Sequence, residues 1–174
     1  MRQLADSARI REFLRAVGAE AEVEARLYLA GGATAVLAGW RPQTIDLDLK
    51  LVPASGRLLE AITRLAEALE LNVDLVSPAD YLPELPGWEE RSPLFAREGR
   101  LACHHYDLDA QALAKIARGH AQDIEDLRLM AAGGLVDPRA LRDHFARLEP
   151  QLHLFPALDA RSLRRWLEET LDSL

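Results

Sequence analysis

The stretch that most constrains the fold of this 174-residue chain lies between residues 28 and 50. It runs from a short apolar segment through Gly31-Gly32 into a sequence in which polar and apolar residues alternate around Asp46 and Asp48. Side chains two residues apart in a strand point to the same face of a sheet. The spacing therefore predicts a strand over 45–52 that carries both carboxylates side by side. The residues expected on its opposite, buried face are Ile45, Leu47 and Leu49.

Two neighbouring carboxylates indicate a site for a positive ion, because Asp46 and Asp48 repel each other unless a cation lies between them. Carboxylate oxygens favour a hard cation, and Mg²⁺ is usually held by one or two carboxylates together with substrate phosphates. The upstream glycine pair leads into an expected short helix over 33–38, whose unpaired backbone N–H groups favour a phosphate. A phosphate-binding turn followed by a paired-carboxylate metal site indicates phosphoryl or nucleotidyl transfer. The simpler alternative is that the two aspartates form a solvated strand face.

The same residues carry a family resemblance. Gly31-Gly32, a short helix and then Asp46-x-Asp48 between apolar residues resemble the signature of the nucleotidyltransferase superfamily, which has the fold of DNA polymerase beta. The Gly-Gly pair and its long gap to the first aspartate are more similar to small bacterial proteins related to abortive-infection and toxin–antitoxin nucleotidyltransferases. The resemblance extends over residues 27–135. It implies an α+β fold with a small mixed β-sheet, flanking helices and a helical C-terminal part.

A third carboxylate, Asp74, stands in the alternating run 71–76, which predicts another strand. The resemblance implies that this strand neighbours the strand of Asp46 and Asp48. It also implies that Asp74 acts as a metal ligand, as the general base toward the attacking hydroxyl, or as both. The alternative is an exposed aspartate at a strand end. The residues expected to be catalytic and to bind metal are Asp46, Asp48 and Asp74.

A long amphipathic helix is expected over 110–132, with Asp109 as its N-cap. Its apolar residues follow one stripe at about 100° per residue, and His120 falls inside this stripe, where a buried histidine with a satisfied ring is expected. Lys115 lies on the opposite, polar side, which in most helices is simply solvated. The residues of the apolar stripe are Leu113, Ile116, Ala117, Ile124, Leu127 and Ala131.

The polar side of this helix extends the resemblance. The polar residues follow the order Lys115, Arg118, Asp123 and Asp126. This Lys–Arg–Asp-x-x-Asp order resembles a helix of the abortive-infection-type nucleotidyltransferases, in which the lysine faces the nucleotide and the trailing acid belongs to the site. Gln122 stands where a second arginine is often expected. We expect this side to face the same cleft as Asp46. The residues expected to bind the nucleotide are Gly31, Gly32, Thr44, Lys115, Arg118 and Asp126.

Composition limits the class of protein. A chain of 174 residues with 49% hydrophobic residues is expected to form one domain, 1–174, with its core at about 1–108 and a helical part at about 109–174. No apolar run approaches the roughly 18 residues of a membrane span, so we expect no membrane association and a cytoplasmic location. The net charge of −7 disfavours binding of nucleic acid by electrostatic attraction over a broad surface.

Local signals predict the remaining elements. The adjacent His104 and His105 are interpreted as structural, within a strand that forms a hairpin with the region of Phe95. Cap residues mark further helix starts. These expected starts are at Asp6 or Ser7, at Ser55 or Gly56, at Asp137-Pro138 and at Asp159.

The function expected from the sequence is metal-dependent transfer of NMP from an NTP to a hydroxyl acceptor, with Mg²⁺, as two ions, and NTP as co-substrate. If the protein is a toxin–antitoxin component, its acceptor is tRNA or a partner protein, and a small antitoxin-like partner is expected. A first alternative is a catalytically inactive nucleotide-binding or protein-interaction module with the same fold. A second is a purely structural α+β protein with exposed aspartates.

Overall fold

A computed structural model describes residues 3–174, and this part of the chain divides into two compact units. The first, here called the sheet unit, comprises the chain up to Ser77 together with Ser92–Tyr106. The second, the helical unit, comprises Pro78–Arg91 and Asp107–Leu174. The expected boundary near residue 108 lies close to the third and last point at which the chain passes from one unit to the other, between Tyr106 and Asp107, whereas 78–91 belongs to the helical unit. That the whole chain is one domain stays a prediction.

The elements follow each other without long irregular segments. The strands are β1 (Ala25–Ala30), β2 (Asp46–Val52), β3 (Asn72–Asp74), β4 (Leu94–Glu98) and β5 (Leu101–His105). The helices of the sheet unit are α1 (Ser7–Glu20), α2 (Gly31–Leu37) and α3 (Gly56–Ala68). Those of the helical unit are η1 (Pro78–Asp80), α4 (Trp88–Arg91), α5 (Leu108–Arg118), α6 (Ala121–Ala132), α7 (Pro138–Leu148), η2 (Glu149–Leu154) and α8 (Ala160–Asp172).

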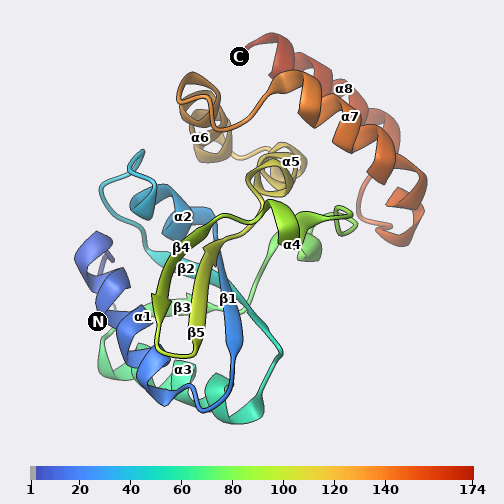
Figure 1. Ribbon diagram of the computed structural model, residues 1–174. Coiled ribbons are helices and arrows are strands. Elements are labelled where there is room, and N and C mark those ends of the chain that lie inside the picture. Colours follow the sequence, from blue (N-terminus) through green and yellow to red (C-terminus); the bar gives the residue numbers. More distant parts are fainter. Residues whose placement is uncertain (1–2) are drawn as a thin grey trace. The chain divides into compact units, whose positions relative to one another are not determined.

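The strands form a mixed sheet in the order β3-β2-β1-β5-β4 (Figure 1). At its centre, β1 runs antiparallel to β2 and parallel to β5. β3 runs parallel to β2 at one edge, and β4 forms the predicted antiparallel hairpin with β5 at the other. The predicted α+β class with a mixed sheet is therefore confirmed.

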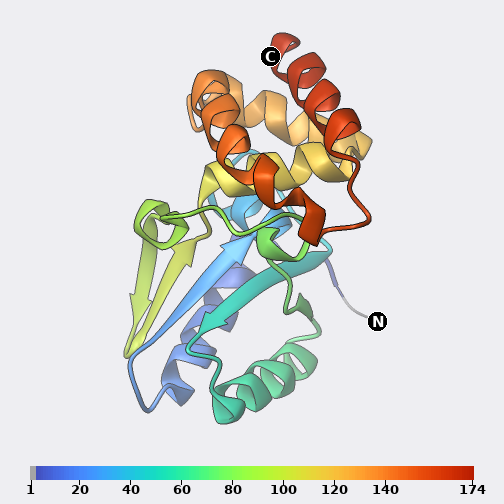
Figure 2. The same cartoon turned by 90° about the vertical axis from the view of Figure 1, so that its right-hand side faces the viewer.

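One face of the sheet packs against α1 and α3, which lie on the same side of it (Figure 2). α1 starts where the sequence predicts, because the Asp6 side chain accepts a hydrogen bond from the Arg9 backbone N–H at 2.9 Å. The larger side chains of the apolar core are Ile10, Phe13, Leu14, Leu27, Leu29, Leu47, Leu49, Leu51, Leu58, Ile62, Leu71 and Leu101. Because these side chains occupy one face, the alternate residues of β1 and β2 point to the other face.

Three expectations for residues 31–76 are wrong. α2 begins at Gly31 and not at residue 33, so both glycines lie in its first turn. Ile45 is 67% exposed instead of buried, because it precedes β2 and takes no part in the alternation of that strand. β3 is also shorter than the predicted run 71–76.

α5 is the central helix of the helical unit and contacts α6, α7, α8 and η1. The prediction of one continuous helix over 110–132 is wrong, because Gly119 adopts a left-handed conformation with a φ of 66° and ends α5. The N-cap is Asp107 and not Asp109, since the Asp107 side chain accepts a hydrogen bond from the Asp109 backbone N–H at 3.2 Å. His120, predicted in the core, lies at the start of α6 with its side chain 76% exposed.

α7 and α8 begin as predicted. The Asp137 side chain accepts from the Arg139 backbone N–H at 3.0 Å, and Asp159 accepts from Ser162 at 2.8 Å. These caps satisfy backbone donors that the first helical turn leaves unpaired.

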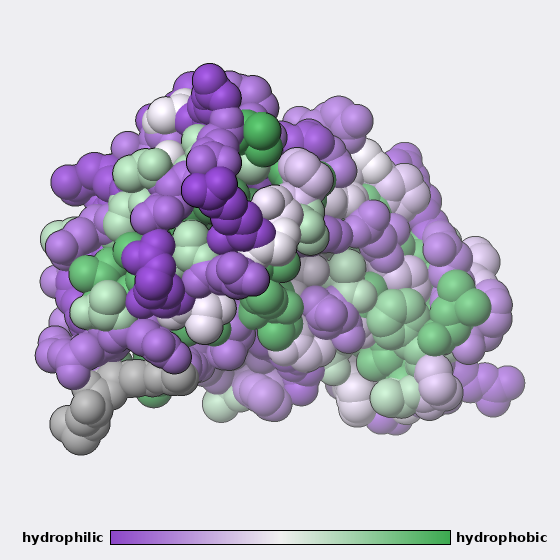
Figure 3. Space-filling model, turned by 90° about the horizontal axis from the view of Figure 1, so that it is seen from below, coloured by the Kyte–Doolittle hydropathy of each residue, from purple (hydrophilic) through white to green (hydrophobic). Residues whose placement is uncertain are grey.

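The surface is mixed in character. On the face shown in Figure 3, hydrophilic side chains cover most of the area and smaller hydrophobic areas lie between them. Within residues 3–174, no helix combines the length and the apolar character that crossing a membrane requires.

Candidate functional site

β2 places Asp46 and Asp48 on the same face of the sheet, as their spacing predicts. The side chains of Leu47 and Leu49 are fully buried in the core. The two aspartates are half-buried and point to the opposite face, in an alternation that continues along the strand. The apolar residues of β2 therefore fix the direction in which both carboxylates point.

Gly31 brings the backbone of α2 against the carboxylate of Asp48. Ala30 is the register partner of Asp48, so the chain leaves β1 directly beside this aspartate. Gly31 then turns the chain with a φ of 54°, which residues with a Cβ rarely adopt. A Cβ on Gly31 would overlap Asp48 Oδ2 and would lie 3.3 Å from its Cγ. Both the turn and the position of the carboxylate therefore require glycine here.

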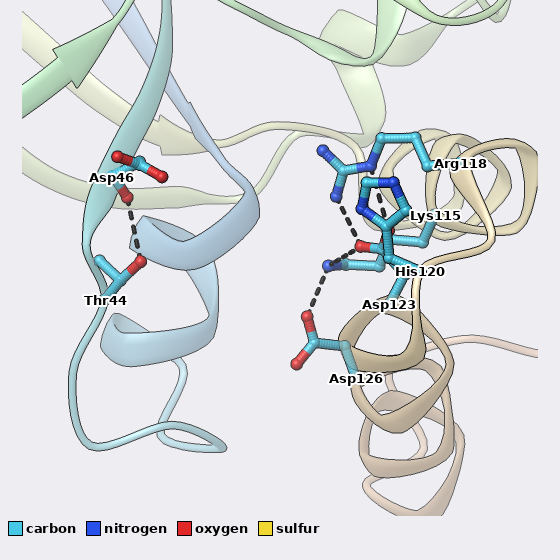
Figure 4. Close-up of polar contacts among 7 residues, drawn as sticks. All are labelled: Thr44, Asp46, Lys115, Arg118, His120, Asp123 and Asp126. Carbon is cyan, nitrogen blue, oxygen red and sulfur yellow. Dashed lines mark hydrogen bonds and ion pairs between the residues drawn. The ribbon is translucent and has the colours of Figure 1, made fainter.

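Gly32 accommodates Thr44 in the same way. A Cβ on Gly32 would overlap Thr44 Oγ1 and would lie 2.8 Å from its Cβ. The Thr44 hydroxyl donates a hydrogen bond to the backbone carbonyl of Asp46 at 3.1 Å (Figure 4). The Thr44 backbone pairs with Ala5 through two hydrogen bonds of 2.8 and 2.9 Å. These contacts fix the start of β2, where Asp46 lies.

β3 adds two polar side chains to the carboxylate face. Its parallel register pairs Asn72 with Asp46 and Asp74 with Asp48, which confirms the predicted neighbourhood of the two strands. The Asn72 side-chain amide donates to Asp46 Oδ1. Asp74 is exposed at the end of β3. Asn72 was not predicted as a site residue, although its position two residues before Asp74 places it on the same strand face.

The donor chemistry of this face fits a hard divalent cation. Asp46, Asp48 and Asp74 offer only oxygen ligands, the type that Mg²⁺ prefers. Among residues 3–174, no three His, Cys, Asp or Glu side chains are grouped closely enough to hold a metal by themselves. A Mg²⁺ site completed by substrate phosphates needs only one or two carboxylates from the protein. The pair on β2 can supply these.

Lys115 belongs to a buried ion-pair cluster within the helical unit (Figure 4). Its Nζ lies 2.6 Å from Asp126 Oδ2 and 3.4 Å from Asp123 Oδ1. Lys115 is 3% exposed, Asp123 is 3% exposed and Asp126 is fully buried. The alternative of a solvated polar side is therefore wrong for Lys115. Because neighbouring helices surround α5, its polar residues are buried as well.

Arg118 completes this cluster across the break at Gly119. Its guanidinium donates to Asp123 Oδ2 at 3.2 Å and to Asp123 Oδ1 at 2.5 Å, and lies 5.1 Å from the centre of the Tyr81 ring. Burial is the largest single effect on the pKa of Arg118 and acts to lower it, but the hydrogen bonds and charge interactions with Asp123 and Tyr81 together outweigh burial and raise that pKa. Asp123 was not among the predicted nucleotide-binding residues. Its spacing of three from Asp126, one helical turn, is the signal that could have found it.

The adjacent histidines make structural contacts, as interpreted from the sequence. His104 Nδ1 lies 3.0 Å from the Ser92 carbonyl oxygen, and His105 Nδ1 lies 3.3 Å from Thr34 Oγ1. Burial lowers the pKa of His105. Burial also raises the pKa of the Cys103 thiol to about 12, so this cysteine is not an activated nucleophile.

The predicted site residues fall into two groups, each within one unit. The group in the sheet unit consists of Gly31, Gly32, Thr44, Asp46, Asp48 and Asp74. The group in the helical unit consists of Lys115, Arg118 and Asp126.

Comparison with known proteins assigns the family. The family described as nucleotidyltransferase of unknown function, DUF6036, matches residues 8–167. No curated protein and no solved structure was found to match the chain. The matched region includes the glycine turn, the carboxylate strands and the cluster around Lys115. The chain therefore belongs to the DUF6036 family, nucleotidyltransferases of unknown function.

Proposed function

We propose that this protein transfers a nucleoside monophosphate from an NTP to a hydroxyl acceptor in a Mg²⁺-dependent reaction. Membership of a nucleotidyltransferase family supports the reaction class. The observation that carries the proposal is the placement of Asp46 and Asp48 on one sheet face, with Asp48 against the glycine turn of α2. This arrangement offers two carboxylates and a backbone without Cβ atoms to one ligand. A metal-bound triphosphate needs both features.

Each predicted site residue of the sheet unit has a defined role in this proposal. Two bound Mg²⁺ ions would stabilise charge on the attacking and leaving oxygens. Asp46 and Asp48 hold the metal, and the glycine pair lets the triphosphate approach the backbone. Thr44 keeps the start of β2 against α2 and supports nucleotide binding in this way. Asp74 accepts the proton of the attacking hydroxyl or completes the metal ligands.

The charged cluster of the helical unit is proposed to contribute to nucleotide binding. The Arg118 side chain is 26% exposed, so part of it is accessible to a phosphate. Lys115 and Asp126 are buried, and Lys115 also pairs with Asp123, the partner of Arg118. Lys115 and Asp126 therefore hold the arginine in place within the cluster.

The test is transfer of radiolabel from NTPs that carry it on the α-phosphate or on the γ-phosphate. Each of the four NTPs is incubated with Mg²⁺, the protein and total tRNA, and label is followed on both RNA and protein. The proposal predicts transfer from the α-phosphate only, abolished by EDTA and by Asp46→Asn or Asp48→Asn. Asp74→Asn should slow transfer by about 10²–10⁴-fold if it is the base. Transfer from the γ-phosphate would contradict the proposal.

A matched control is Asp143→Asn, which removes an exposed carboxylate on α7 and should leave transfer unchanged. The second candidate is a catalytically inactive nucleotide-binding module with the same fold. Calorimetric binding of an NTP without any label transfer would support that module over the enzyme.

The proposal extends to a biological setting, a toxin–antitoxin system in the cytoplasm, where NTPs are abundant. The acceptor would be tRNA or a partner protein, and a small antitoxin-like protein would neutralise the activity. Induced expression of the wild-type chain in a bacterium should then arrest growth, whereas Asp46→Asn should not. Equal growth of both strains would argue against this setting and would leave the reaction class untouched.

A further inference from the structure

We infer that Asn72 is a positioning residue that orients Asp46 toward the divalent cation of the proposed site. Asn72 opens β3 and lies directly beside Asp46 in the parallel register of β2 and β3. Its side-chain amide donates to Asp46 Oδ1, and both side chains are half-buried. The inference rests on the proposed function, because it concerns a ligand of the metal that the reaction would use.

The chemistry of the contact suits a metal ligand. An ionised carboxylate has about four lone-pair sites on its two oxygens, and one amide donor occupies only one of them. The amide is neutral, so it orients Asp46 without cancelling the charge that attracts a cation. The helical unit shows the opposite arrangement, because Lys115 and Arg118 neutralise Asp123 and Asp126 there.

Two hydrogen bonds thus hold Asp46 in place, and they have different effects. The Thr44 hydroxyl binds its backbone carbonyl at 3.1 Å and fixes the strand at this residue. Asn72 binds its side chain and restricts the rotation of the carboxylate. Partners that hold metal ligands in this way typically contribute about 10–100-fold to metal affinity. Loss of the Asn72 amide should therefore weaken metal binding although Asp46 itself is retained.

The experiment is a titration of the full-length protein with Mn²⁺ alone, in which free Mn²⁺ is followed by electron paramagnetic resonance. Asn72→Leu keeps a similar side-chain volume without the amide, and Asn72→Ala truncates the side chain. The matched control is Gln3→Leu, which removes an exposed amide donor that binds Glu70 Oε2 at 2.8 Å. Thermal unfolding midpoints of all variants are measured in parallel without metal.

We expect both Asn72 variants to bind Mn²⁺ about tenfold or more weakly at an unchanged unfolding midpoint, and Gln3→Leu to bind like wild type. Wild-type affinity in both Asn72 variants overturns the inference and leaves the proposed function standing. Weaker binding that appears equally in Gln3→Leu, or only together with a lowered midpoint, also overturns it. If Asp46→Asn binds Mn²⁺ like wild type, the proposed metal site itself fails.

Discussion

At the scale of single residues, Gly31 links the backbone conformation to the proposed chemistry. Its φ of 54° starts α2 immediately after β1, and the space where a Cβ would stand is filled by the carboxylate of Asp48. A side chain at this position would therefore disturb both the turn and the proposed metal ligand. Gly39 separates these effects, because it has a φ of 94° but nothing within 4 Å of its missing Cβ.

Gly31→Ala should lower stability and abolish Mn²⁺ binding, whereas Gly39→Ala should lower stability alone. The strain of a positive φ should lower the free energy of unfolding of each variant by on the order of 1 kcal/mol, but only alanine at position 31 displaces Asp48. Thermal unfolding and Mn²⁺ titration of the two variants test this. Retained Mn²⁺ affinity in Gly31→Ala would show that the close approach to Asp48 is not needed for the site.

His105 gives a pH-dependent prediction. Burial lowers its pKa in the folded state, so as the pH falls through about 6.5 the unfolded chain takes up a proton before the folded one. The contribution of the neutral His105 to folding stability is thus fully present above about pH 6.5 and is lost as the pH falls below that value. His105→Gln should reduce the loss of thermal stability between about pH 7.5 and 5.5, and His153→Gln, at an exposed position, should not. An equal pH dependence in His105→Gln and wild type would contradict this.

At the scale of elements, local patterns predict the carboxylate face but not the helical cluster. Alternation around Asp46 and Asp48 is enough to define β2 and its polar face, because a strand repeats every two residues. The spacing of apolar residues could not predict the break between α5 and α6, because the apolar stripe that begins at Leu113 keeps its helical spacing on both sides of Gly119. Lys115 is buried in a helix that packs against α6, α7 and α8, and the spacing of residues within one helix does not predict such contacts.

The junction of α5 and α6 should be sensitive to loss of one charge. Lys115→Met leaves Asp126 and Asp123 buried with one cation fewer, which should cost about 3–5 kcal/mol. Arg57→Met breaks an exposed ion pair with Glu22 and should cost at most about 1 kcal/mol. Urea unfolding of both variants measures the difference. If Lys115→Met is no less stable than Arg57→Met, the cluster does not hold the two helices together.

At the scale of the whole molecule, the net charge of the protein affects which substrates can approach it. The chain carries a net charge of −7 and so repels a polyanion at long range. Mg²⁺ cancels part of the charge of an NTP, so a metal-bound nucleotide approaches such a protein more easily than a long RNA does. An RNA acceptor would therefore depend on local contacts close to the carboxylate face.

The most direct test of the central claim is a crystal structure of the protein with Mn²⁺ and a non-hydrolysable NTP analogue, with anomalous diffraction recorded at the manganese edge. We predict an anomalous peak within bonding distance of carboxylate oxygens from both Asp46 and Asp48, with the triphosphate beside Gly31 and Gly32. A bound nucleotide whose Mn²⁺ lies elsewhere, while both carboxylates contact only water, would contradict the account.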